Sequence, residues 1–173
     1  MSMDSLLAFA RDNAILSLAL LGITLALVYI ANSILGAIPI DLGGGKRLSL
    51  DTILGWLFAP LMYVAGVPWE EAVKAGSFVG QKTVFTEFVA FINLGNLPAG
   101  EMTERTRTLV TYAICGFANV ASVGITVAGL SSLLPERRGE VISLVWKALM
   151  AGFLANCMTA SLVGLFPAEM FQR

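Results

Sequence analysis

Two long stretches without a charged side chain constrain what this chain can fold into. They are Asn13–Ile40 and Thr108–Pro135. A helix rises about 1.5 Å per residue, so each stretch is long enough to cross the ~30 Å hydrocarbon core of a bilayer at a tilt. A third stretch, Val141–Phe166, carries one charge, Lys147, close enough to its start for the ammonium to reach the membrane surface. We therefore expect three transmembrane helices.

The composition favours a membrane protein and excludes several functional classes. Hydrophobic residues make up 57% and charged residues 13% of the chain, whereas soluble domains carry about 25% charged residues. The net charge is −1 and no basic cluster occurs, so nothing indicates a nucleic-acid partner. Histidine is absent, and no metal-ligand spacing, nucleophile motif or nucleotide-binding motif is found. We expect an all-α membrane protein, not an enzyme, without catalytic residues, metal site or bound cofactor.

Residues 49–69 form a shorter apolar segment that we expect to lie at the membrane surface. Pro60 and Gly66 weaken it as a helix. Trp56 and Trp69 are side chains that favour the headgroup level. An interfacial helix is the preferred interpretation, and a full span is the alternative.

Residues 70–98 contain two arms that are too short to span a bilayer. Glu70–Gln81 and Phe88–Leu97 both fall short of the ~20 residues that a span requires. A re-entrant helical hairpin, which enters the membrane and returns to the same side, fits both lengths. The spacing of Gly76 and Gly80 favours close packing of the first arm against another helix.

These segments give a predicted order of parts along the chain. Glycine and polar residues gather at the centre of the second uncharged stretch, which predicts an interrupted helix there. The expected parts are a scaffold-like N-terminal transmembrane helix in 1–48, the interfacial helix in 49–69, and a transport-type segment in 70–173 with the re-entrant hairpin 70–98, the interrupted helix 107–134 and the last helix 138–167.

Three polar residues lie inside these apolar segments: Glu87 between the hairpin arms, and Asn119 and Ser122 in the interrupted helix. Buried polar groups in a membrane cost free energy unless they bind something. Secondary transporters build substrate sites by pairing broken helical elements in this way. Simpler interpretations stay open, with Glu87 facing water and Asn119 and Ser122 hydrogen-bonding between helices. Lys82 is expected to meet headgroups or to pair with a nearby acid.

Five short motifs occur in order between residues 49 and 166. They are Gly55–Pro60, Gly66–Trp69, Gly80–Phe91, Cys115–Gly124 and Pro135–Arg138. In order and spacing they resemble the C-terminal half of the concentrative nucleoside transporter family, whose pattern there is roughly G-x-x-F-A-P, G-V-P-W, G-x-K-x-x-x-N-E-F-V-A-Y, C-G-F-A-N-x-x-S-I-G and P-E-R-R. Residues 13–40 resemble that family only in hydropathy.

The resemblance implies an elevator-type, cation-coupled nucleoside importer, usually a homotrimer, that lies as a multi-pass protein in the inner (plasma) membrane. It assigns the ribose hydroxyls to the hairpin carboxylate, here Glu87, and to the polar pair Asn119 and Ser122. It places Phe117 against the substrate. It also puts the turn at 136–138 in the cytoplasm, whereas a count of positive charges on the loops favours the opposite orientation.

The sequence departs from the family at two motif positions and in one larger respect. Thr86 stands where the family has Asn, and Phe91 stands where it has Tyr. The hydroxyl of Thr86 is still expected to cap the second hairpin arm. The family's first half, with a hairpin that reads the nucleobase and helps to hold sodium, has no counterpart in this sequence. The chain thus resembles one of two inverted repeats, and the site for the coupling ion, Na⁺ or H⁺, is not expected in it.

Two functional hypotheses follow. The first is the C-terminal half of a sodium- or proton-coupled nucleoside transporter, which supplies the ribose-binding side and is inactive without an N-terminal half. The second is a non-transporting assembly or regulatory protein derived from that family. The absent base-and-sodium motif favours the second, whereas the retained Glu87, Asn119 and Ser122 favour the first. The sequence leaves open whether a purine or a pyrimidine nucleoside is preferred. It also leaves open whether the chain is a fragment, the product of a truncated gene or a split subunit.

Overall fold

The structure is a computed structural model that describes residues 26, 29–37 and 48–171. It divides the chain into two units, Met1–Leu50 and Asp51–Arg173, which are described separately. In the first unit residues 29–36 are helical, and the side-chain oxygen of Asn32 accepts a hydrogen bond from the backbone N–H of Leu50 at 2.8 Å. Most of the transmembrane helix expected over 13–40 lies outside the described residues.

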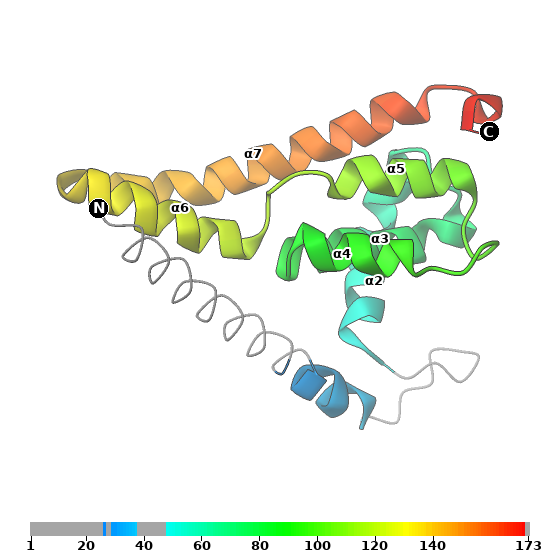
Figure 1. Ribbon diagram of the computed structural model, residues 1–173, viewed down its shortest axis with the longest axis horizontal. Helices are drawn as coiled ribbons and strands as arrows, with labels where there is room; N and C mark the ends of the chain where they lie inside the picture. The colour runs from blue at the N-terminus through cyan, green and yellow to red at the C-terminus, as the bar shows by residue number, and fades with distance from the viewer. Residues whose placement is uncertain (1–25, 27–28, 38–47, 172–173) are drawn as a thin grey trace, which may run out of the picture. The chain divides into compact units, whose positions relative to one another are not determined.

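The second unit is built from helices (Figure 1). In chain order they are α2 Leu50–Val64, α3 Trp69–Val84, α4 Glu87–Gly95, α5 Glu104–Ile114, α6 Val120–Leu133, the 3₁₀ turn η1 Pro135–Arg137, α7 Arg138–Gly164 and the 3₁₀ turn η2 Ala168–Phe171. No strand occurs among the described residues. The predicted all-helical fold class is therefore confirmed.

A sharp turn joins α2 to α3, whose axes are bent by 118°. Gly66, in the turn, has φ of 101°, a left-handed conformation that glycine adopts without strain. The two helices then pack closely through α3 glycines. A β-carbon at Gly76 would lie 2.5 Å from the carbonyl oxygen of Gly55, and one at Gly80 would collide with Leu54. The expected close contact at Gly76 and Gly80 is confirmed, with α2 as the partner helix.

The hairpin formed by α3 and α4 turns at Phe85 and Thr86. Thr86 adopts an extended backbone, and its hydroxyl accepts a hydrogen bond from the N–H of Val89 at 3.4 Å. This confirms the cap expected from the sequence. With 16 residues in α3 and 9 in α4, each arm is shorter than a bilayer-spanning helix.

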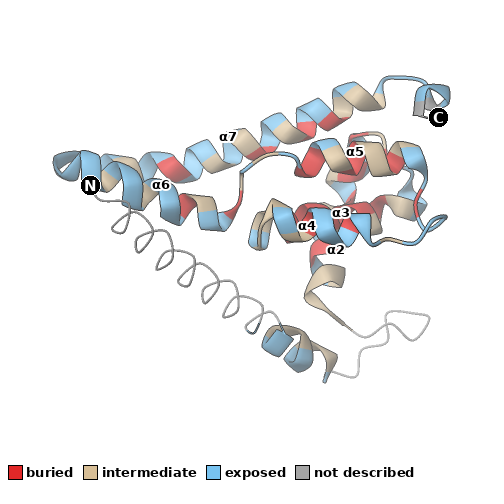
Figure 2. Cartoon of the chain, in the orientation of Figure 1, coloured by how far each residue is buried: buried red, intermediate tan, exposed pale blue. Residues whose placement is uncertain are grey.

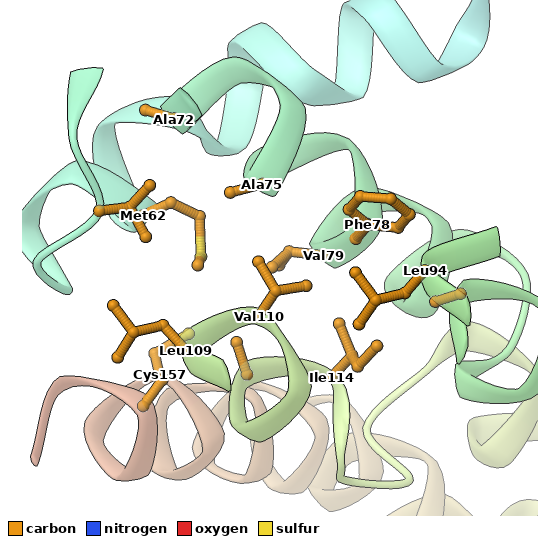
Figure 3. Packing of buried hydrophobic residues seen from close by; sticks show 14 of the residues in the cluster. Met62, Ala72, Ala75, Phe78, Val79, Leu94, Leu109, Val110, Ile114 and Cys157 are labelled. Carbon is orange, nitrogen blue, oxygen red and sulfur yellow. The ribbon is translucent and has the colours of Figure 1, made fainter. Parts of the chain in front are cut away.

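The core gathers where α2, α3, α5 and α7 meet, as Figure 3 shows for Met62, Val79, Leu109 and Cys157. Helices α5 and α7 lie side by side, and α6 runs along the first part of α7 (Figure 1). Much of α6 and α7 is exposed (Figure 2). The exposed residues of these two helices include large apolar ones, among them Ile125, Leu133, Met158 and Leu162. Helices that are apolar all round are typical of surroundings of lipid or other protein.

Residues 104–133 do not form one continuous helix. Helix α5 ends at Ile114, and α6 begins at Val120 after an irregular segment. Among the described residues, one helix is long and apolar enough to cross a bilayer, Pro135–Gly164, while α6 has 14 residues. The predicted count of three spans, one interfacial helix and one re-entrant hairpin stays a prediction.

Candidate functional site

Glu87 opens helix α4, directly after the hairpin tip. Its carboxylate is half-buried, and Oε2 accepts a hydrogen bond from the side-chain Nδ2 of Asn119 at 2.7 Å. This contact joins the hairpin to the start of α6 across 32 residues of sequence. Glu87 is therefore not simply a charge in water, and its second oxygen is left for another donor because a carboxylate accepts several hydrogen bonds.

Asn119, the donor in the hydrogen bond to Glu87, is itself held in place by hydrogen bonds to Ser122. It is buried, with 3% of its surface exposed, and it is the N-cap of α6. Its Oδ1 accepts a hydrogen bond from the N–H of Ser122 at 2.7 Å, and its own backbone N–H donates to Ser122 Oγ at 3.3 Å. This reciprocal capping box satisfies backbone donors at the helix start. It also holds the amide group of Asn119 toward Glu87, so three of the four expected site residues form one hydrogen-bonded set.

Phe117 lies in the break between α5 and α6 and is 78% exposed. Its carbonyl accepts a hydrogen bond from the N–H of Asn119 at 3.1 Å, which folds the irregular segment into a tight turn. Gly116 lets this turn approach α7, because a β-carbon there would collide with the side chain of Asn156. Neither aromatic ring pair found among the described residues includes Phe117.

A cavity of about 380 Å³ lies between the helix break, α6 and α7. Phe117, Ser122 and Asn156 contribute to its lining, together with apolar residues such as Leu149. Its volume falls within the ~300–1,000 Å³ of small-molecule sites. Glu87 and Asn119 do not line it. Ser122 thus belongs both to the hydrogen-bonded set with Asn119 and to the cavity lining. Phe117 lines the cavity and is joined to Asn119 through its backbone carbonyl.

Lys82 corrects one expectation from the sequence. The side chain is completely buried, at 0% exposure, so it does not meet lipid headgroups. Its ammonium makes no hydrogen bond or salt bridge with a described residue, and Nζ lies 5.3 Å from the centre of the Phe153 ring on α7. The expectation failed because α3 packs against α4 and α5, and the side chain of Lys82 reaches the Phe153 ring of α7, which the sequence alone does not reveal.

Three other residues of this region have defined surroundings. Cys115 is exposed at the end of α5, while Cys157 on α7 is buried. Thr159 donates to the carbonyl of Ala155 in its own helix at 3.0 Å. Its neighbour Asn156 packs against Gly116.

A chain of polar side chains that links both hairpin arms to α2 was not predicted from the sequence. Gln81, on α3, donates to Asp51 Oδ1 at 3.0 Å and accepts from Asn93 Nδ2 at 2.8 Å. Arg105 was also missed. It donates to the carbonyls of Gly66 at 2.5 Å and Gly164 at 2.6 Å, and so ties the α2–α3 turn to the end of α7. In the sequence, a polar residue within an apolar helix indicates that a hydrogen bond is needed there. It does not indicate which residue is the partner, because the partner depends on tertiary packing.

Comparisons with known proteins show which proteins this chain resembles. The family described as "Na+ dependent nucleoside transporter C-terminus" matches residues 10–164. An uncharacterised transporter of Bacillus subtilis, YutK, is 44% identical over 141 residues, which cover 82% of this chain and 34% of the relative. The nucleoside permease NupC of Helicobacter pylori is 40% identical over 125 residues, or 70% of this chain and 30% of that protein.

Solved structures give the same result for the fold. The transporter CNTnw in an inward-facing substrate-bound state superposes with a TM-score of 0.79 at 42% identity, covering 91% of this chain and 39% of that one. A variant of CNTnw in an outward-facing state gives a TM-score of 0.80 at 41% identity, with the same coverage. The chain spans about a third of the length of these bacterial relatives. By the match over residues 10–164, the chain belongs to the Na⁺-dependent nucleoside transporter family, in its C-terminal part.

Proposed function

We propose that this chain supplies the ribose-binding side of a cation-coupled nucleoside transporter. The observation that carries the proposal is the 2.7 Å hydrogen bond between Glu87 and Asn119, which unites the hairpin tip and the broken helix. A carboxylate with a free oxygen accepts hydrogen bonds from hydroxyl groups, and a carboxamide both donates and accepts them. Adjacent hydroxyls on a sugar present this pattern. The relative NupC of Helicobacter pylori is a nucleoside permease, which supports a nucleoside as the ligand.

Each predicted site residue has a role in this proposal. Glu87 accepts from the ribose hydroxyls, and Asn119 orients Glu87 and contacts the sugar with its remaining amide hydrogen. Ser122 holds Asn119 in place through the capping box. Phe117, exposed beside the cavity, offers an apolar face to the nucleoside.

The proposed setting is a bilayer crossed by three helices, over 13–40, 107–134 and 138–167, with the second interrupted at its centre. The segment 1–48 acts as a scaffold, 49–69 lies in the interface, and 70–98 forms a re-entrant hairpin. The exposed apolar side chains of α6 and α7 support contact with lipid or with a second protein segment. As for the family, the inner (plasma) membrane is the proposed location, with the turn at 136–138 in the cytoplasm.

The proposed partner is the N-terminal half of such a transporter. The bacterial relatives are about three times as long as the matched region, which leaves room for a second repeat in them. That half would supply contacts to the base and the site for Na⁺ or H⁺, and the full assembly would be a homotrimer. Alternating access requires two repeats that move against each other around the site.

Reconstitution in liposomes tests this proposal. Alone, the chain is expected to take up uridine no faster than empty vesicles under an inward sodium or proton gradient, because the ion site whose differential affinity drives uphill movement is proposed to lie in the N-terminal half. Together with an N-terminal half from a close relative, it is expected to give gradient-dependent uptake. Gradient-dependent uptake by the chain alone contradicts the half-transporter proposal. No uptake by the pair favours the non-transporting interpretation.

A further inference from the structure

We propose that Gln81 is a positioning residue for Glu87, because its side chain holds the two arms of the hairpin to each other and to α2. Gln81 lies on α3 before the hairpin tip, and its partner Asn93 lies on α4 after the tip, 12 residues along the chain. The inference rests on the proposed function, since it takes Glu87 as the group that binds the sugar. Gln81 acts without direct contact to the ligand.

The first observation is a buried carboxamide with both of its polar atoms in use. Gln81 has 6% of its surface exposed. Its Nε2 donates to Asp51 Oδ1 at 3.0 Å, and its Oε1 accepts from Asn93 Nδ2 at 2.8 Å. A buried carboxamide without partners costs free energy, so both bonds stabilise this position of the side chain. We refer to Asp51, Gln81 and Asn93 as the hairpin brace, since the three side chains join α2, α3 and α4.

The second observation is that the brace connects directly to the hairpin tip. The backbone carbonyl of Gln81 accepts a hydrogen bond from the N–H of Phe85 at 2.8 Å, at the end of α3. Phe85 and Thr86 form the tip, and Glu87 follows as the first residue of α4. A displacement of Gln81 is therefore passed to the tip through one helical turn.

Helix α4 depends on such attachments because it is short and little of it is buried. It has nine residues, and its buried residues are Ala90 and Leu94. The cap bond at its start is 3.4 Å long, and Arg107 of α5 donates to the carbonyl of Leu97, beyond its end, at 2.9 Å. A helix of this length is not stable in isolation. The bond from Asn93 to α3 therefore helps to fix the direction of α4 and of the carboxylate at its first residue.

The carboxylate of Glu87 is then held from two directions. Asn119 donates to its Oε2 from the start of α6. The hairpin brace holds the backbone on either side of the tip to α2 and α3. A carboxylate that is fixed before the ligand arrives loses less conformational entropy on binding, and it favours hydroxyl groups at defined positions. The brace thus contributes to the recognition of the sugar.

Thermal midpoints of the full 173-residue chain in detergent test the brace without any ligand. Gln81→Met keeps the length of the side chain but replaces neither hydrogen bond, and it should lower the midpoint by about 6 °C. Asn93→Leu removes one of the two bonds and should lower it by about 3 °C. The double variant should lower it no further than Gln81→Met, because both changes remove the same bond. Additive shifts would overturn the brace.

Asn96→Leu is the matched control in the same arm. Asn96 is the exposed C-cap of α4, and its backbone N–H bonds to carbonyls of that helix. The substitution should shift the midpoint by no more than about 2 °C, and its shift should add to that of Gln81→Met. Coupling of Asn96→Leu to Gln81→Met as strong as that of Asn93→Leu would contradict a specific bond between the arms.

The ratio of uridine affinity to 3′-deoxyuridine affinity tests the positioning role in the chain assembled with an N-terminal half. A general loss of folded protein lowers both affinities equally, whereas a displaced Glu87 loses the hydroxyl that only uridine has. Gln81→Met should reduce the ratio by about threefold or more. Gln81→Glu combined with Asp51→Asn exchanges donor and acceptor within the same shape, and it should restore most of the ratio. Gln81→Glu alone sets two carboxylates against each other and should not restore it.

The outcomes separate this inference from the proposed function. An unchanged ratio in Gln81→Met, while Glu87→Gln loses uridine binding, refutes the positioning role and leaves the sugar contact intact. Unchanged uridine affinity in Glu87→Gln removes the sugar contact, and the positioning role with it. An exchange variant no better than Gln81→Glu alone also refutes the positioning role. If Gln81→Met does not fold, Asn93→Leu, at an exposed position, carries the same ratio measurement.

Discussion

Glu87→Gln is expected to abolish measurable uridine binding by the assembled transporter while the chain still inserts in membranes and remains helical. Glutamine keeps the shape of the side chain, and its carbonyl oxygen can still accept the hydrogen bond from Asn119. The negative charge is lost, and the free oxygen is replaced by an amide NH2 group, which donates hydrogen bonds and cannot accept one from a hydroxyl. Each hydrogen bond to a charged group is worth about 1.5–3 kcal/mol, so two lost ribose contacts weaken binding by ~100-fold or more.

The matched control is Glu101→Gln, the same substitution in the loop beyond α4. Glu101 is exposed and pairs with Lys74, away from the Glu87–Asn119 contact. The Glu101→Gln variant should bind uridine with the same affinity as the unmodified protein. Isothermal titration of both variants at one pH measures the difference, and equal affinity in Glu87→Gln and Glu101→Gln removes Glu87 from the site.

Asn119→Leu is expected to damage both the fold of α6 and the binding of nucleoside. Leucine cannot cap the helix, which costs about 0.5–2 kcal/mol, and it leaves Glu87 without its donor. Because Asn119 is buried, water does not replace the lost hydrogen bonds. Together these effects should lower the free energy of unfolding by about 2–4 kcal/mol.

Asn119→Ser separates the two roles. Serine is an N-cap of similar strength, so Asn119→Ser should keep the capping contribution and lose clearly less stability than Asn119→Leu. Serine is too short to reach Glu87, so uridine affinity should still fall by about tenfold or more. If Asn119→Ser binds uridine normally, Asn119 serves only as a helix cap and the Glu87–Asn119 contact has no part in recognition.

The parts of the structure that depend on local chemistry were predictable from the sequence. Thr86 caps α4 because a hydroxyl beside an extended backbone reaches the free N–H groups of the next turn. Gly76 and Gly80 permit close contact because they have no β-carbon, wherever the partner helix lies. The clustering of Asn119 with Ser122 follows from their spacing of three residues, although the structure makes them a capping box at a helix start.

The parts that depend on tertiary packing were not predictable. Lys82 looked like a surface lysine, because a residue's burial depends on which helices surround it. Gln81 bonds to two residues that are 30 positions before it and 12 positions after it, and no local pattern selects those partners. Arg105 binds carbonyl groups of two distant turns in the same way. The resemblance of motifs identified the sugar-binding candidates, but it did not reveal the hydrogen bond from Asn119 to Glu87.

The most direct test of the account is an experimental structure of this chain assembled with an N-terminal half and bound to uridine. The account predicts ribose hydroxyl oxygens about 2.5–3.2 Å from the Glu87 carboxylate and the Asn119 amide, with Phe117 against the nucleoside. A uridine whose ribose lies against the other half, with Glu87 and Asn119 bonded only to each other, would contradict the central claim that this chain carries the sugar side of the site.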